Sequence, residues 1–143
     1  DMGKHILIPV DGSEQAHQAC AFVAEEYPEA KVTLLHVINP AEAGYSVEAS
    51  IPTYSENWYE RQKERAETIS YDVETDLDGN SGEIDRVVEV GKPTHTIVGY
   101  AEDNGIDQIV MGSHGRSGVT RILLGSVAET VVRRSPVPVT VVR

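Results

Sequence analysis

Short apolar runs alternate with helix-like segments along the whole chain, and this alternation restricts the possible folds more than any other feature. Strands are predicted at Lys4–Val10, Lys31–Ile38, Ile84–Val90, Asp107–Gly112 and Val137–Val142. Helices are predicted between them at Glu14–Tyr27, Tyr54–Leu77, Pro93–Asn104 and Val127–Arg134. Strands that alternate with helices in this way predict βαβ units, and therefore a mainly parallel sheet with helices on both faces.

The composition of the individual strands predicts their order. The first, second and fourth strands are almost continuously apolar, as expected for central strands that are covered on both faces. The strand Ile84–Val90 carries charges and the last strand contains Pro138, so both are placed at edges. The result is a single α/β domain over residues 1–143, with an open five-stranded parallel sheet of order 3-2-1-4-5 and a Rossmann-like architecture. The order reverses between strands one and four, which is where such sheets bind ligands.

The composition also narrows the class of partner. The 143 residues include 23 acidic and 12 basic ones, for a formal net charge of −11. So acidic a chain disfavours nucleic acid, whose phosphate backbone attracts basic surfaces. An acidic protein with few lysines is compatible either with simple solubility or with adaptation to high salt, as in halophiles.

The expected location is the cytoplasm. No apolar stretch approaches the roughly 18 residues of a membrane span, and no basic-then-apolar leader opens the chain, so no membrane association is expected. Cys20 is the only cysteine, which excludes an internal disulfide and agrees with a reducing compartment. We assign Cys20 to the core.

A glycine-rich segment follows the fourth predicted strand. Gly112-Ser113-His114-Gly115 is separated by nine residues from Gly125-Ser126, which precedes the last helix. Glycine allows positive φ and a close approach of backbone N–H groups to an oxygen ligand, and a helix N-terminus adds a favourable dipole. The segment therefore predicts a phosphate site, with a flexible connection between strand and helix as the alternative.

The charges in this segment support an anion site. No acidic residue lies between Asp107 and Glu129, whereas His114, Arg116 and Arg121 do. His114 and Arg116 either contact phosphate or extend into solvent, and Arg121 is assigned to the surface.

Two residues beside the predicted site have alternative roles. Asp11, at the end of the first strand, either caps the first helix, or accepts ribose hydroxyls, or holds Mg²⁺ through water. Ser126 caps the last helix, offers its hydroxyl and first-turn N–H groups to a terminal phosphate, or does both. The histidines outside the glycine-rich segment lack metal-ligand spacing and are assigned to strands and helices: His5, His17, His36 and His95.

Several familiar motifs are absent from the sequence. There is no G-x-x-x-x-G-K-[ST], so a P-loop ATPase is not predicted, and no G-x-G-x-x-G after the first strand, so dinucleotide binding of that type is not predicted. A serine elbow, H-E-x-x-H and a cysteine cluster are also missing. No catalytic residue is assigned.

The spacing G-x2-G-x9-G-[ST] at Gly112, Gly115, Gly125 and Ser126 closely resembles that of the universal stress protein family, in its UspA-like, ATP-binding branch. The resemblance extends over the chain, through ILIPVDGSE at 6–14, LLHVI at 34–38, the strand at 107–113 and PVPVTVV at 136–142. It implies the fold of the adenine nucleotide alpha hydrolase group.

The resemblance also implies roles for individual residues. The adenine would lie beside Pro9 and Val10 and against the backbone of Val37, with Asp11 at the ribose or at the phosphates and Mg²⁺. The glycine-rich segment would surround ribose and phosphates. The complete set implied for ATP is Pro9, Val10, Asp11, Val37, Met111, Gly112, Ser113, His114, Gly115, Arg116, Gly118, Gly125, Ser126 and Val127.

Homodimerisation through the last strand is a further implication of the resemblance. The residues themselves agree, because an uncharged apolar edge strand needs a partner to cover it. The expected interface is Val137, Pro138, Val139, Thr140, Val141 and Val142.

Three functions remain open. The first is an ATP-binding, homodimeric module for stress response or regulation. The second is a slow ATP hydrolase or phosphotransferase, although no clear base or water-positioning residue is found beyond Asp11 and His114. The third is a dimeric adaptor without nucleotide. No motif covers Asn39–Asn57, and whether this segment forms a lid is open.

Overall fold

A computed structural model describes residues 3–42, 56–113 and 124–143. Its sheet has the order β3-β2-β1-β4-β5, and all neighbouring strands are parallel. The strands are β1 His5–Pro9, β2 Lys31–Ile38, β3 Ile84–Val90, β4 Gln108–Gly112 and β5 Val139–Val142. The predicted α/β fold and strand order are therefore confirmed.

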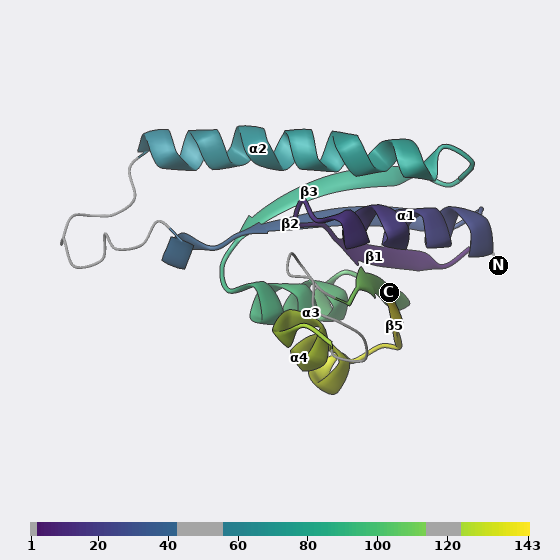
Figure 1. Cartoon of the computed structure of the whole chain (residues 1–143). Helices are drawn as coiled ribbons and strands as arrows, with labels where there is room; N and C mark the ends of the chain where they lie inside the picture. Colours follow the sequence, from purple (N-terminus) through teal and green to yellow (C-terminus); the bar gives the residue numbers. More distant parts are fainter. Residues whose placement is uncertain (1–2, 43–55, 114–123) are drawn as a thin grey trace.

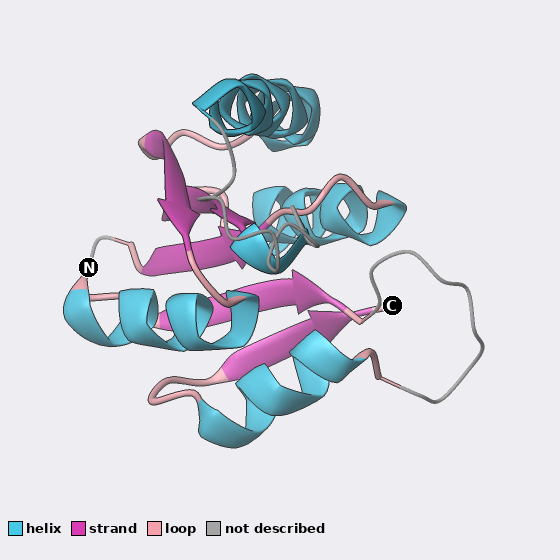
Figure 2. Ribbon diagram, turned by 90° about the vertical axis from the view of Figure 1, so that its left-hand side faces the viewer, coloured by secondary structure: helices cyan, strands magenta, loops and turns pink. Residues whose placement is uncertain are grey.

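Helices cover both faces of the sheet (Figures 1 and 2). The α-helices are α1 Glu14–Glu26, α2 Glu56–Glu74, α3 Pro93–Asp103 and α4 Ser126–Arg134. Two short 3-10 helices, η1 Pro40–Glu42 and η3 Thr75–Leu77, follow β2 and α2. In Figure 1, α2 lies above the sheet, and α3 and α4 lie below it.

Alternation along the central strands separates two hydrophobic cores. Ile6 and Ile8 of β1 belong to the core with α1 and α2. Leu7, between them, faces the core with α3 and α4. All three side chains are completely buried, as expected for a strand covered on both faces.

Some predicted boundaries were wrong. The long polar helix ends at Glu74, and Leu77 lies in η3. The last strand begins at Val139 because Val137 is held in a turn: its N–H and its carbonyl both bond to Ser135 Oγ, at 3.0 and 2.7 Å. Pro138, which follows, has no N–H to donate to a ladder. Two of the six residues expected at the dimer interface therefore precede the strand.

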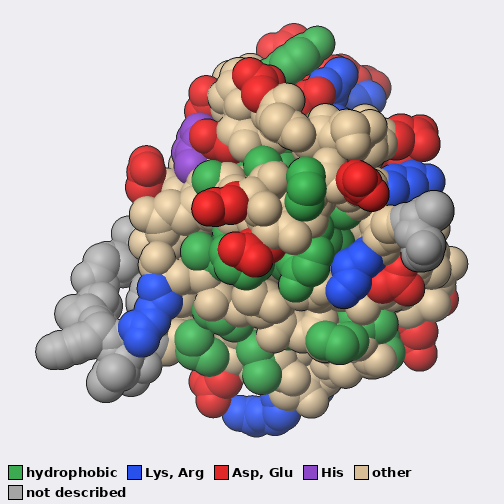
Figure 3. Space-filling model, turned by 90° about the vertical axis from the view of Figure 1, so that its right-hand side faces the viewer, with side chains coloured by type: hydrophobic (Ala, Val, Ile, Leu, Met, Phe, Trp, Pro, Cys, Tyr) green, Lys and Arg blue, Asp and Glu red, His purple; other side chains and the backbone are tan. Residues whose placement is uncertain are grey.

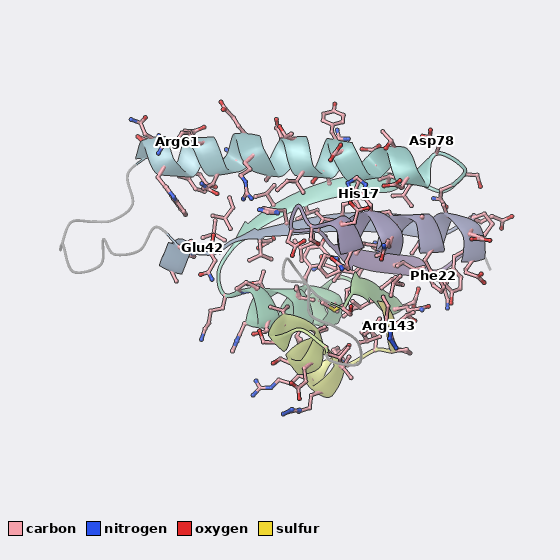
Figure 4. The ribbon with its side chains drawn as sticks, in the orientation of Figure 1. His17, Phe22, Glu42, Arg61, Asp78 and Arg143 are labelled. Carbon is pink, nitrogen blue, oxygen red and sulfur yellow. The ribbon has the colours of Figure 1, made fainter. Side chains whose placement is uncertain are left out.

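His17 connects α1 to the end of α2 (Figure 4). Its Nδ1 lies 2.6 Å from Asp76 Oδ2, and its Nε2 lies 3.4 Å from Asp72 Oδ2. The hydrogen bond to Asp76 raises the pKa of His17, partly opposed by burial. His17 therefore links α1 to the last turn of α2, through Asp72, and to η3, through Asp76.

Cys20 lies in the core, as predicted, and burial raises its pKa to about 12. A residue with such a thiol packs in the core and does not act as a nucleophile.

Figure 3 shows acidic side chains spread over one face, with hydrophobic side chains near its centre. No helix within the described ranges is long and apolar enough to cross a membrane.

Candidate functional site

A pocket of about 360 Å³ opens at the carboxyl ends of β1, β2 and β4, where the strand order reverses. The first turns of α1 and α4 border it, and α2 and α3 complete its wall. Pockets for small ligands commonly have volumes of this order, roughly 300–1,000 Å³. The topology therefore places a cavity at the predicted position.

The pocket gathers ten of the fourteen residues expected at the nucleotide from four separate segments. They are Pro9, Val10, Asp11, Val37, Met111, Gly112, Ser113, Gly125, Ser126 and Val127. The other four, His114, Gly115, Arg116 and Gly118, lie outside the described residues, as does Arg121. Most of the segment considered as a lid, residues 43–55, also lies outside them.

The turn between β1 and α1 forms one side of the pocket. Gly12 has a φ of +87°, a conformation that favours glycine. Oδ1 of Asp11 accepts a hydrogen bond from the N–H of Ser13 at 2.9 Å, and Ser13 is the N-cap of α1. The alternative that Asp11 is the helix cap is therefore wrong. Its carboxylate is exposed beside the pocket, with one oxygen engaged by the turn.

The end of β4 contacts the start of α1. A Cβ placed on Gly112 would lie 2.3 Å from Cβ of Gln15, and the φ of Gly112 is not in the positive range. The packing of α1 therefore requires glycine here, and the predicted positive φ is wrong for Gly112. The N–H of Gly125 donates to the carbonyl of Ser113 at 2.7 Å, so the two ends of the glycine-rich segment meet.

The start of α4 borders the same pocket. Gly125 is the N-cap, with extended backbone, and Ser126 is the first helical residue, so the alternative that Ser126 is the cap is wrong. The first N–H groups of an α-helix have no acceptor within the helix, and its dipole favours an anion nearby. Ser126 and Val127 are in this first turn and line the pocket, which suits a phosphate.

His36 is a site residue that the sequence analysis assigned only to a strand. It is buried on β2 and lines the pocket, and its Nδ1 lies 2.9 Å from the carbonyl oxygen of Val10. Burial lowers the pKa of His36, although this hydrogen bond acts in the opposite direction. A neutral ring that donates from Nδ1 keeps its lone pair on Nε2, which can accept a hydrogen bond. A polar residue inside the apolar run LLHVI was the available signal.

Other unpredicted residues come from η1 and α2. Asn39 and Glu42 follow β2, and Gln62 and Arg65 lie on the N-terminal half of α2. Figure 4 shows Glu42 at η1, beyond the end of β2. No sequence motif marks them, because their position depends on how α2 packs across the sheet.

The donor set suits a phosphorylated ligand with an apolar ring. Leu35, Val37, Ile97 and Met111 supply apolar wall, while the start of α4 supplies N–H groups. Asp11 and Glu42 are the carboxylates among the described lining residues. Mg²⁺ commonly takes one or two carboxylates together with ligand phosphates, and the exposed carboxylate of Asp11 has the chemistry of such a ligand. No cluster of three metal-binding side chains occurs within the described ranges.

Comparison with known proteins gives a consistent result. A sequence model of the universal stress protein family matches residues 2–143. The universal stress protein MJ0577 of Methanocaldococcus jannaschii is 34% identical over 157 residues, covering 99% of this chain and 96% of that protein.

Solved structures agree with the sequence comparison. The structure of MJ0577 superposes with a TM-score of 0.82 and 37% identity, over 99% of this chain and 96% of the other. A universal stress protein from Archaeoglobus fulgidus, solved in complex with dAMP, gives a TM-score of 0.64 at 23% identity and covers both chains completely.

Proposed function

The chain belongs to the universal stress protein family, and on that basis we propose that it binds ATP, with Mg²⁺, as a regulatory module. The observation that carries this proposal is the convergence of ten predicted nucleotide-binding residues on one pocket at the reversal of strand order. The dAMP complex of the Archaeoglobus fulgidus protein supports an adenine nucleotide as the ligand class.

In the proposed arrangement, the adenine lies at the ends of β1 and β2. Val10 and Met111 contribute apolar surface there, and the backbone of Val37 meets the edge of the ring. The ribose lies beside Asp11, whose carboxylate accepts its hydroxyl groups.

The phosphates extend toward the start of α4 in this arrangement. N–H groups at Ser126 and Val127 meet the terminal phosphates, and the glycine-rich segment surrounds the chain of phosphates. Asp11 is available to hold Mg²⁺ through water, where the ion would offset the charge of the phosphates.

We further propose a homodimer through β5. This strand lies at the edge of the sheet, and its four residues are half-buried in the single chain. A second copy that pairs with β5 would form hydrogen bonds with the free backbone groups of this strand. An exposed apolar edge without such a partner would be prone to uncontrolled association.

Nucleotide analysis of the purified protein tests the function. The protein is denatured, and the supernatant is analysed by absorbance and chromatography; protein without nucleotide is then titrated with Mg·ATP. Bound ATP, or saturable ATP binding, supports the proposal. Steady formation of ADP from added ATP would favour the hydrolase, and a protein that no adenine nucleotide fills would favour the adaptor.

A further inference from the structure

We propose that Arg65 on α2 is a specificity-determining residue, which makes the pocket prefer phosphorylated nucleotides to the neutral nucleoside. This inference rests on the proposed function, because it concerns the same pocket. It adds α2 to the ligand-binding elements, and it adds a side chain that no sequence motif indicates.

The position of Arg65 places its charge over the pocket. Arg65 and Gln62 are three residues apart on α2, so they share one face of the helix, and both line the pocket. Nη2 of Arg65 is 4.0 Å from the position that a Cβ on Gly12 would occupy. The guanidinium group therefore lies over Gly12, in the turn between β1 and α1 that also carries Asp11.

Arg65 offsets negative charge at the pocket. Asp11 and Glu42 would repel a polyphosphate, and the chain as a whole has a net charge of −11. Arg65 is the only lysine or arginine among the described residues that line the pocket. The charges of Arg65, Asp11 and Glu42 all act on His36, which agrees with their gathering around one space.

Arg65 is also available to a ligand. Within the described parts of the chain, Arg86 pairs with Glu74 and Arg133 pairs with Glu129, but Arg65 forms no ion pair with a described carboxylate. The chain has 23 acidic residues that could pair with an arginine, yet Arg65 has no such partner among the described ones. Its guanidinium group can therefore bind an anionic ligand without first breaking an internal ion pair.

The test measures binding of adenosine, AMP, ADP and ATP by calorimetry at low salt, for wild type, Arg65→Gln, Arg65→Lys and Arg61→Gln. Arg65 is exposed on a helix and glutamine is a good helix former, so folding should be retained. Arg61 is a matched control because it is also exposed, lies one turn earlier on α2 and does not line the pocket (Figure 4).

We expect Arg65→Gln to weaken ATP binding about tenfold, AMP binding by a smaller factor, and adenosine binding hardly at all. Salt should reduce the difference between ATP and adenosine, Arg65→Lys should keep most of the ATP affinity, and Arg61→Gln should resemble wild type. Equal losses for all four ligands, no loss, or a lysine variant that behaves like glutamine would overturn the inference. Wild-type protein that binds no nucleotide would instead overturn the proposed function, and the inference with it.

Discussion

Gly112 at the end of β4 lies directly against Gln15 in the first turn of α1. A Cβ on Gly112 would be 2.3 Å from Cβ of Gln15 and 3.1 Å from its carbonyl carbon and oxygen. The contact joins β4 and α1, which both border the pocket. The absence of a side chain at Gly112 therefore sets how closely α1 can approach the end of β4.

Gly112→Ala should lower the free energy of unfolding by about 1–3 kcal/mol, since backbone and Cβ atoms of Gln15 cannot give way without moving α1. Urea unfolding measures the change. Gly99→Ala is the matched control: Gly99 is inside α3 with open space around it, so alanine should leave stability unchanged or raise it by up to about 1 kcal/mol. Equal effects at both positions would contradict this account.

Replacement of His17 should change the pH dependence of stability. The pKa of His17 is raised in the folded protein by its hydrogen bond to Asp76, so protonated His17 stabilises the fold. That contribution is fully present below the ordinary pKa of about 6.5 and is lost as the pH rises through the raised value.

The stability difference between wild type and His17→Gln should therefore be greatest near pH 6, at about 0.5–1 kcal/mol, and shrink by pH 9. Urea unfolding across this range measures it, with His95→Gln, on an exposed part of α3, as the control. A difference that stays constant with pH would show that the His17 charge does not stabilise the contact.

Proline at position 141 tests the proposed dimer. The carbonyls of Pro138 and Val142 accept hydrogen bonds from the N–H groups of Ile109 in β4 and of Ser113 directly after it. By alternation the backbone groups of Thr140 also face β4, whereas those of Val139 and Val141 face the free edge. Val141→Pro should therefore leave the monomer folded but weaken pairing. Sedimentation equilibrium should show a monomer for Val141→Pro, while Thr140→Pro should lower stability instead. A wild-type protein that is already monomeric would refute the dimer.

Gly115→Val tests the role of the glycine-rich segment. Valine adds a branched side chain where close approach of the backbone to phosphate is expected, so ATP affinity should fall about tenfold or more. Calorimetric titration measures the change. Gly79→Val, in an open turn after η3 and outside the pocket, should retain wild-type affinity. Wild-type affinity in the Gly115 variant would remove this segment from the proposed binding site.

The pattern of apolar residues was sufficient to predict the sheet. Continuous apolar runs predicted the central strands, and charged residues such as Arg86 in β3 predicted an edge strand. Both predictions succeeded because the composition of a strand follows directly from how far its two faces are buried. Boundaries were less predictable where a side chain competed with the backbone. The hydrogen bonds between Ser135 Oγ and the backbone of Val137 hold this residue in a turn, so β5 begins only at Val139.

The strand order could be predicted from the residues alone, and it places the pocket beside the segments that follow β1 and β4, because parallel strands bring their carboxyl ends to one edge. The residues that complete the pocket wall became known only from the packing of the folded chain. The hydrogen bond from His36 to Val10 and the place of Arg65 over Gly12 depend on the packing of β2 and α2, which joins residues far apart in the chain. Such contacts depend on how whole elements dock, and no local spacing of residue types encodes that.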